Sequence, residues 1–314
     1  MMEYRQLGRT GLNVSRIAFG TLPFKIREFS DEEGAELLVA AAERGINFFD
    51  LGEVYDTYRH MRAALRQIRQ PVVIASKSMA KDAESMNASI RKALDEIGVG
   101  RIDLFKMHSV DTLDDLEARR PAWEALQQAK ADGLVGAIGV STHSCRVMER
   151  IVGWPDVEVI LAVLNREGNG ICEGTVAEMY DLIKVAHASG KGIYLMKAFA
   201  GGLLFADGRK ALEYQLGIPE ADSMAVGMQN LNEVIFNIAV ASGEEVPAEV
   251  RQAMDTRPRE LHIRPFCKAC GACLDACRYG ALTMGEKMPE VDREACILCG
   301  YCGFACPAAA IKII

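Results

Sequence analysis

Three absences narrow the classes of protein to which this sequence can belong. It has no basic run, and its 36 Lys and Arg are outnumbered by 43 Asp and Glu, which gives a formal net charge of −7. A net acidic chain without a basic patch is a poor ligand for nucleic acid or for an anionic membrane. No apolar stretch is long enough to span a bilayer, and the first residues lack the apolar segment of a secretory signal. We therefore expect a cytoplasmic protein without nucleic-acid or membrane partners.

Cysteine, in contrast, is plentiful and unevenly placed. Eight of the 10 cysteines lie between Cys267 and Cys306, and the other two are Cys145 and Cys172. In a chain without an export signal, clustered cysteines indicate a metal site rather than a disulfide framework. The two isolated cysteines have no partner pattern, so we expect them to be small buried thiols.

Residues 1 to about 240 alternate between short β-branched runs and amphipathic stretches with helical spacing. Each of eight strand candidates is followed by a helix candidate, and repeated βα units require parallel strands with right-handed crossovers. The strand candidates are 16–19, 46–50, 72–75, 102–105, 135–140, 157–160, 192–196 and 223–226. This number of units predicts an α/β fold, a closed (β/α)8 TIM barrel. An open doubly wound sheet is the alternative, but residues 20–24 are not the glycine-rich phosphate turn that it would need.

The composition changes after residue 243. Segment 244–261 is polar and contains Pro247 and Pro258, which predicts a linker with a short helix. Residues 262–314 form a second unit in which the run Cys267-Lys-Ala-Cys270-Gly-Ala-Cys273 recurs as Cys296-Ile-Leu-Cys299-Gly-Tyr-Cys302. Such an internal repeat indicates duplication of a small metal-binding half. We therefore predict a barrel over 1–243, a linker over 244–261 and a small C-terminal α+β domain over 262–314.

Each half of the C-terminal unit carries the spacing C-x2-C-x2-C-x3-C, which resembles that of bacterial two-cluster ferredoxins. Pro307 matches the proline that usually follows the fourth cysteine, whereas Arg278 departs from it and would alter the turn and raise a neighbouring cluster's potential. In those ferredoxins the fourth cysteine of each run ligates the other cluster. The resemblance implies two [4Fe-4S] clusters, one held by Cys267, Cys270, Cys273 and Cys306, and the other by Cys277, Cys296, Cys299 and Cys302. Two zinc sites are the alternative, because paired C-x2-C is also a zinc spacing.

Four polar residues lie at or just beyond the ends of successive strand candidates. They are Asp50, Tyr55, Lys77 and His108. Reacting groups of such barrels lie at the carboxyl ends of the strands, so we expect these four side chains to converge. The ammonium of Lys77 should lower the pKa of the Tyr55 phenol from its ordinary value of about 10, while Asp50 fixes the lysine and His108 orients a carbonyl oxygen. Taken singly, each residue could be structural, but together they predict reduction of a ketone or aldehyde with Tyr55 as the proton donor.

Residues 1–240 resemble the aldo-keto reductases. The similarity covers the N-terminal hairpin (4–15), the segments with the four polar residues (47–55, 75–77 and 101–108) and the segment 136–141. The ferredoxin-like tail resembles an iron–sulfur subgroup of that family, which Met196-Lys197 and Gly227-Met228 also match. The resemblance implies a nicotinamide cofactor, with contacts at Ser141, Asn165, Lys197, Gly227, Asn230 and Asn237.

The sequence also departs from the family pattern. Leu161 stands where many members have a glutamine that holds the carboxamide, and Glu233 stands where an arginine is common. A carboxylate would repel the 2′-phosphate of NADPH but could accept a hydrogen bond from a ribose hydroxyl, which favours NADH. The loops that cover such barrels look short here, so we expect the C-terminal unit to cover the barrel mouth.

Three functional hypotheses follow. In the first, the protein is a nicotinamide-dependent oxidoreductase that acts on a small carbonyl or alcohol substrate, with clusters that are structural or dock an electron-transfer partner. In the second, the clusters exchange electrons with the barrel site instead of nicotinamide, with a flavin as the mediator, because hydride carries two electrons and a cluster exchanges one. In the third, the chain is a non-catalytic electron-transfer or redox-sensing protein. The four polar residues favour the first two.

Overall fold

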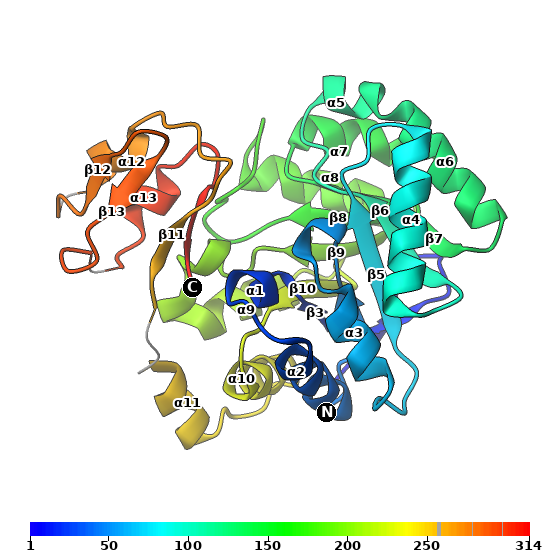
Figure 1. Cartoon of the computed structure of the whole chain (residues 1–314), viewed down its shortest axis with the longest axis horizontal. Coiled ribbons are helices and arrows are strands. Elements are labelled where there is room, and N and C mark those ends of the chain that lie inside the picture. The colour runs from blue at the N-terminus through cyan, green and yellow to red at the C-terminus, as the bar shows by residue number, and fades with distance from the viewer. Residues whose placement is uncertain (256–258, 278, 297) are drawn as a thin grey trace.

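The computed structural model describes residues 1–255, 259–277, 279–296 and 298–314, so Pro258 and Arg278 lie outside the described residues (Figure 1). Eight parallel strands form a closed barrel in the order β10-β3-β4-β5-β6-β7-β8-β9, which confirms the predicted TIM barrel. The barrel strands are β3 (Ile17–Gly20), β4 (Phe48–Asp50), β5 (Val73–Ser78), β6 (Ile102–Met107), β7 (Val135–Thr142), β8 (Val159–Val163), β9 (Gly192–Met196) and β10 (Ser223–Gly227). Each overlaps one of the strand candidates read from the sequence.

Helices follow the strands and form the outer layer of the barrel (Figure 1). The α-helices of this layer are α1 (Leu22–Ile26), α2 (Asp31–Glu43), α3 (Tyr58–Leu65), α4 (Ala83–Ile97), α5 (Leu113–Ala118), α6 (Arg120–Ala131), α7 (Cys145–Val152), α8 (Val176–Ala188), α9 (Gly208–Leu216) and α10 (Leu231–Ala241). Helix α2 begins with a capping box, in which Ser30 Oγ accepts from the Glu33 backbone N–H and the Glu33 carboxylate accepts from that of Ser30. None of the helices in the described part of the chain is long and apolar enough to cross a membrane.

The apolar core has two parts because successive side chains of a strand point to opposite faces. Phe48 faces the barrel interior, whereas its neighbour Phe49 packs outward against the helices. The interior is closed at its amino end by a hairpin of β1 (Tyr4–Gln6) and β2 (Asn13–Ser15), which contributes Leu7 and Val14 to it. Both core layers leave the carboxyl ends of the strands free to carry polar groups.

After helix α11 (Ala248–Asp255), the C-terminal unit consists of two small hairpins and two short helices. Strand β11 (Leu261–Ile263) pairs with β14 (Ile311–Ile313), and β12 (Leu282–Met284) pairs with β13 (Pro289–Val291). The helices are α12 (Ala272–Ala276) and α13 (Tyr301–Phe304). Left-handed backbone recurs at equivalent positions of the two halves, at Ala269 and Leu298, at Gly271 and Gly300, and at Gly280 and Ala309. The duplication seen in the sequence is therefore also present in the backbone.

The C-terminal unit lies against loops at the carboxyl end of the barrel (Figure 1). Strand β14 packs on the short 3-10 helix η2 (Ala200–Gly202), which follows β9. Gly202 has a φ of 97°, and a Cβ there would overlap the Ile313 carbonyl oxygen. The Asn169 side chain, in the loop after β8, donates to the Gly303 carbonyl at 3.1 Å. The unit therefore covers part of the barrel mouth, as the short cover loops led us to expect.

Candidate active site

The four polar residues predicted to act together come from three adjacent barrel strands. Asp50 ends β4, Lys77 lies near the end of β5, and His108 directly follows β6. Tyr55 ends the 3-10 helix η1 (Glu53–Tyr55), which begins just beyond β4. Between them, a side chain at Gly52 would be crowded, because a Cβ would come within 3.1 Å of the Tyr55 ring and 3.3 Å of Lys77 Cγ. The structure thus brings all four side chains to one end of the barrel.

Asp50 is the counter-ion of two buried lysines. Its Oδ2 accepts from Lys77 Nζ at 2.5 Å, and its Oδ1 accepts from Lys106 Nζ at 3.2 Å and from the Tyr194 hydroxyl at 2.8 Å. Burial alone would raise the pKa of Asp50, but the two ammonium groups outweigh it and lower that pKa to about 2. The sequence analysis missed Lys106 and Tyr194, although polar residues inside the apolar runs of β6 and β9 were a visible signal.

One carboxylate does not compensate two ammonium groups equally. Burial is the largest single effect on Lys77 and lowers its pKa, but the contacts with Asp50 and Tyr55 together outweigh it, so the pKa is raised and the side chain stays charged. Burial dominates for Lys106, and with repulsion from Lys77 it lowers the pKa to about 7. Lys77 also donates to the Leu51 carbonyl at 2.7 Å, which fixes its direction. Lys77 is therefore the permanent cation of this group.

Tyr55 and His108 face one another at the open side of this ion pair. The Tyr55 hydroxyl lies 3.5 Å from His108 Nε2, the two rings meet edge to face, and Lys77 Nζ lies 4.7 Å from the centre of the Tyr55 ring. Burial and the charge of Lys77 hold the pKa of His108 well below its ordinary value, so the imidazole is neutral. The oxygen of a bound carbonyl group can thus be reached by a phenol and a neutral imidazole together.

The expected direction of the Tyr55 pKa shift was wrong. Lys77 does act to lower the pKa, but burial of the phenol is the larger effect, and the pKa is raised above its ordinary value. The phenol consequently keeps its proton throughout the neutral range. Lys77 would act chiefly when a phenolate forms, by stabilising the negative charge beside it.

A buried arginine, which the sequence analysis did not single out, holds the strand ends in place. The Arg119 guanidinium donates to the carbonyls of His108 at 3.0 Å, Ser78 at 3.0 Å and Ala80 at 2.9 Å. These carbonyls end β5 and β6, so Arg119 joins the loops that carry Lys77 and His108. The residue lies on a helix start, far from any motif, which explains why local sequence gave no signal.

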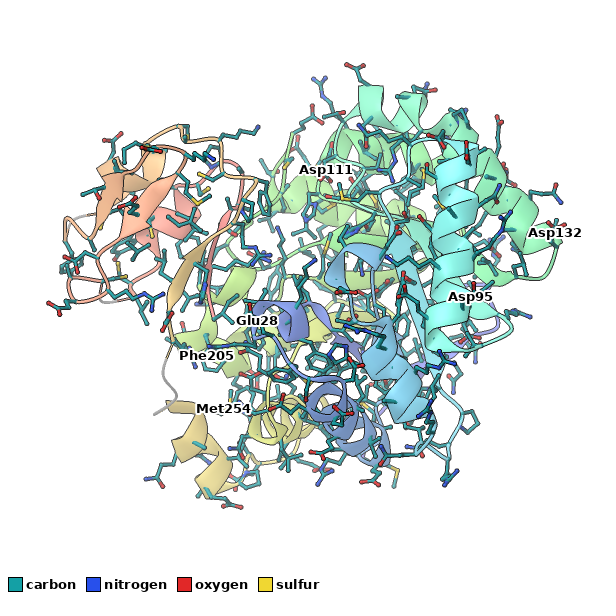
Figure 2. The ribbon with its side chains drawn as sticks, viewed as in Figure 1. Glu28, Asp95, Asp111, Asp132, Phe205 and Met254 are labelled. Carbon is teal, nitrogen blue, oxygen red and sulfur yellow. The ribbon has the colours of Figure 1, made fainter. Side chains whose placement is uncertain are left out.

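A second polar group lies next to His108. The Asp111 carboxylate accepts from the Ser109 hydroxyl at 2.6 Å and from the His143 backbone N–H at 2.7 Å, and it lies 3.1 Å from His143 Nδ1. Figure 2 labels Asp111 at the side of the barrel towards the C-terminal unit. These contacts and the nearby His143 lower the pKa of Asp111 to about 2 despite its burial. A fixed negative charge therefore stands one loop away from His108.

The residues implied as nucleotide contacts follow the remaining strands. Ser141 lies on β7, and its Oγ accepts from the Ser109 backbone N–H at 2.8 Å, which leaves its own proton free to donate. Asn165 follows β8, where its amide is used within its own loop: Oδ1 accepts from two backbone N–H groups and Nδ2 donates to the Asn169 carbonyl. Lys197 directly follows β9 in a left-handed conformation, with a φ of 62°. These three side chains share the mouth of the barrel.

The other three implied contacts lie near β10. Gly227 ends that strand and is exposed, and Asn230 caps α10 by accepting from the Glu233 backbone N–H at 2.9 Å. Asn237 lies two turns further along α10 and is 2% exposed. Glu233 is also buried, at 4% exposed, and accepts from the Gln229 backbone N–H. The predicted preference for NADH, which rested on Glu233, stays a prediction.

The cysteine thiols gather into the two sets that the ferredoxin resemblance implies. Burial raises the pKa of the Cys273 thiol, and the neighbouring thiols that raise it further are Cys306, Cys267 and Cys270. For Cys302, whose pKa burial raises to about 11, those neighbours are Cys296, Cys299 and Cys277. These last four cysteines line one cavity. The donor chemistry therefore fits a cluster in each half, with the fourth cysteine of each run exchanged.

Backbone groups add to this fit. The Ala269 backbone N–H donates to Cys267 Sγ at 3.4 Å, and that of Ala310 donates to Cys306 Sγ at 3.3 Å. Within the described residues, no three Cys, His, Asp or Glu side chains are gathered around a single-ion site. Four thiols in each set, with the fourth cysteine exchanged, fit a multi-iron cluster of the ferredoxin type.

Comparison with known proteins agrees with this geometry. Residues 16–251 match the model of the aldo/keto reductase family. The chain belongs to the aldo/keto reductase family. Residues 266–310 of this aldo/keto reductase match the 4Fe-4S dicluster domain, so the protein is an oxidoreductase of this family that carries an iron–sulfur unit.

Individual relatives cover the two parts of this aldo/keto reductase. L-galactose dehydrogenase of Arabidopsis thaliana is 22% identical over 287 residues, which are 77% of this chain and 88% of that protein. A solved structure described as an aldo-keto reductase of Pseudomonas aeruginosa is 28% identical with a TM-score of 0.66, covering 76% of this chain and 94% of that one. A ferredoxin of Methanocaldococcus jannaschii is 42% identical over 62 residues, which are 19% of this chain and 41% of that protein.

Proposed function

We propose that this aldo/keto reductase interconverts a small carbonyl compound and its alcohol, with Tyr55 as the proton donor to the carbonyl oxygen. The observation that carries the proposal is the 3.5 Å approach of the Tyr55 hydroxyl to His108 Nε2 beside the Lys77–Asp50 ion pair. A carbonyl oxygen placed between the phenol and the imidazole can accept a hydrogen bond from each. His108 then orients the oxygen and Tyr55 supplies the proton.

The charges around Tyr55 suit this role. Its raised pKa keeps the phenol protonated until hydride reaches the carbonyl carbon and negative charge develops on the oxygen. As the proton leaves, the phenolate forms beside the ammonium of Lys77, which Asp50 holds in its charged form. Asp50 is a positioning residue because it acts through Lys77.

A nicotinamide, when bound, would supply the hydride. The free donor of Ser141 suits a carboxamide oxygen, and Lys197, Gly227 and Asn230 follow the strands that complete the mouth. Asn165 and Asn237 would contribute through the shape of their loop and helix, because the Asn165 amide is already paired and Asn237 is buried.

The proton-donor proposal is tested by Tyr55→Phe in the cluster-loaded protein. We expect the oxidation of NADH or NADPH by 4-nitrobenzaldehyde to fall about 10²- to 10⁴-fold, the range usual for a lost general acid. Tyr4→Phe is the matched control, because it removes a hydroxyl that donates to the Gly45 carbonyl at the amino end of the barrel. An unchanged rate in Tyr55→Phe would refute the assignment.

A ferredoxin-linked reaction is the second candidate, and the position of the C-terminal unit favours it. Lys268, which lies between the cluster cysteines Cys267 and Cys270, is a charged neighbour of Cys172 in the loop after β8. Electrons from a cluster would thus arrive beside the barrel mouth, where a flavin would convert them into hydride. Turnover with a reduced ferredoxin, and none with either nicotinamide, would favour this reaction over the first.

A further inference from the structure

Strand β14 presents one cation to the barrel. Ile311 lies in the small core of the C-terminal unit and Ile313 is also buried, so the alternation of a strand turns Lys312, between them, to the opposite face. That face lies on the loop after β9: a Cβ at Gly201 would come within 3.3 Å of Lys312 Cγ. Lys312 is thus a residue of the C-terminal unit whose side chain lies at the barrel mouth.

A second lysine of the barrel lies beside it. Lys197 follows β9, and its ammonium rests against the loop after β8, since a Cβ at Gly170 would come within 2.7 Å of Lys197 Nζ. Lys197 and Lys312 act on one another and both act on the imidazole of His143. The lysine pair is therefore joined to the reacting groups through His143 and Asp111, one loop away from His108.

Lys312 has no anion acting on it among the described residues, and the one carboxylate that acts on Lys197 is Asp111. Neither takes part in a hydrogen bond or ion pair there, and both side chains are partly accessible rather than sealed. The nearest fixed anion, Asp111, already accepts from Ser109 and His143. Burial, together with repulsion from Lys197 and Arg264, lowers the pKa of Lys312 to about 7. Two largely buried cations whose one nearby carboxylate is already engaged are costly to keep charged unless a ligand supplies further negative charge.

We propose that Lys312 and Lys197 form a binding site for the carboxylate of the substrate, completed by the C-terminal unit, in which Lys197 binds the substrate in place of the nucleotide contact that the family resemblance implies. This inference rests on the proposed function and narrows it: the substrate class is an aldehyde or ketone that carries a carboxylate, or the corresponding hydroxy acid. The carboxylate bonds to the two ammonium groups while the carbonyl oxygen lies between Tyr55 and His108.

A phosphate of a bound nucleotide is the other source of such an anion, because loops after the seventh and eighth strands of these barrels often hold phosphate. The position of the pair favours the substrate. Lys197 follows β9, the seventh barrel strand, but its ammonium rests against Gly170 in the loop after β8 and acts on His143 after β7, on the side of the mouth that carries His108. The implied nucleotide contacts Gly227 and Asn230 lie at the end of β10 and beyond it, away from the loops after β7 and β8.

The first experiment measures binding without turnover. Calorimetric titration of the cluster-loaded full chain with benzoate should show binding that weakens about ten- to a hundredfold in Lys312→Met and in Lys197→Met, the range for a lost charge-assisted hydrogen bond. Lys287→Met is the matched control, because Lys287 is exposed in the turn between β12 and β13. Thermal unfolding separates this role from a structural one, since removal of an unpaired buried cation should leave Lys312→Met at least as stable as the wild type.

Three results would overturn the proposal: no benzoate binding by the wild type, equal binding by Lys312→Met and the wild type, or a lower melting temperature of Lys312→Met that accounts for the loss. A parallel titration with inorganic pyrophosphate tests the other source. If pyrophosphate binding depends on Lys312 and benzoate binding does not, the pair serves a nucleotide phosphate.

The second experiment measures specificity with two substrates that differ only in charge. The wild type should reduce 4-carboxybenzaldehyde with a higher kcat/KM than methyl 4-formylbenzoate, and Lys312→Met should remove that difference through a higher KM for the acid alone. Equal kcat/KM values for the acid and the ester in the wild type would contradict the proposed substrate class. Lys312-dependent benzoate binding without reduction of either aldehyde would support the carboxylate site and refute the carbonyl reduction itself.

Discussion

The charge balance at the barrel mouth depends on single residues. Asp50 pairs with Lys77 and Lys106 and accepts from Tyr194, so one carboxylate determines the charge of two lysines. Lys77 keeps its proton, whereas the pKa of Lys106 falls to about 7. This division leaves one permanent cation near Tyr55 and makes Asp50 the residue on which the site depends most.

Asp50→Asn tests that dependence. The substitution leaves Lys77 and Lys106 buried without a counter-ion, and we expect the free energy of unfolding to fall by about 3–5 kcal/mol, as when one partner of a buried pair is removed. Urea unfolding monitored by circular dichroism gives the value. Adding Lys106→Met to Asp50→Asn should recover part of the lost free energy of unfolding, because it removes one of the two cations that have no counter-ion. No recovery would mean that repulsion between the lysines is not the cause.

A pH dependence follows from Lys106. Its pKa is lowered to about 7 in the folded protein from an ordinary value of 10.5, so the unfolded chain binds more protons between these values. Stability therefore rises with pH from about 7 towards 10, because ∂ΔG/∂pH has the sign of the extra protons bound by the unfolded state. Urea midpoints at pH 7, 8 and 9 should increase in the wild type and increase less in Lys106→Met. If the urea midpoints of the wild type and of Lys106→Met rose equally with pH, Lys106 would be charged in the folded protein and its pKa would not be lowered.

At the scale of elements, the docking of β14 on η2 joins the two units. Gly202 has a left-handed backbone, and the Ile313 carbonyl occupies the space where its Cβ would be. Glycine is needed there twice over, for its φ and for the close approach of β14.

Gly202→Ala should detach β14 from the barrel without unfolding it. Gly243→Ala is the matched control, because Gly243 has a φ of 67° and nothing within 4 Å of its Cβ position, so it carries only the cost of the conformation, about 1 kcal/mol. Limited proteolysis should release the C-terminal unit faster from Gly202→Ala than from the control. Equal rates would show that β14 shifts to accommodate a methyl group.

Elements also show where sequence reasoning succeeded and where it stopped. The strands were predictable because β-branched runs are a local pattern, and the cysteine sets were implied by the resemblance of the C-x2-C-x2-C-x3-C spacing to that of two-cluster ferredoxins. Lys106, Tyr194, Arg119 and Lys312 were not, because their roles depend on which strands become neighbours and on how the C-terminal unit docks. The predicted direction of the Tyr55 pKa shift was wrong for a related reason. The charge of Lys77 can be read from the sequence, but the depth to which the phenol is buried cannot.

At the scale of the whole molecule, the C-terminal unit covers part of the barrel mouth, and its two halves exchange the fourth cysteine of each set. The crossed cysteine sets predict that Cys306→Ser disturbs the cluster of Cys267, Cys270 and Cys273 rather than that of its nearer neighbours in sequence. Anaerobically purified wild type should contain about eight irons. Iron analysis with electron paramagnetic resonance should show one altered cluster in Cys306→Ser and a second cluster with an unchanged signal. A signal change confined to the cluster of Cys296, Cys299 and Cys302 would contradict the crossed assignment.

The packing of β14 on the loop after β9 has a consequence for the order of assembly in the cell. Translation completes the eight barrel strands before the cysteine-rich segment leaves the ribosome, so the nascent barrel remains uncovered on this side. We expect the covering strand to take its place once the cysteine-rich segment has folded around its clusters. Cells starved of iron should therefore accumulate a folded but unfinished reductase, with an open entrance in place of its finished one.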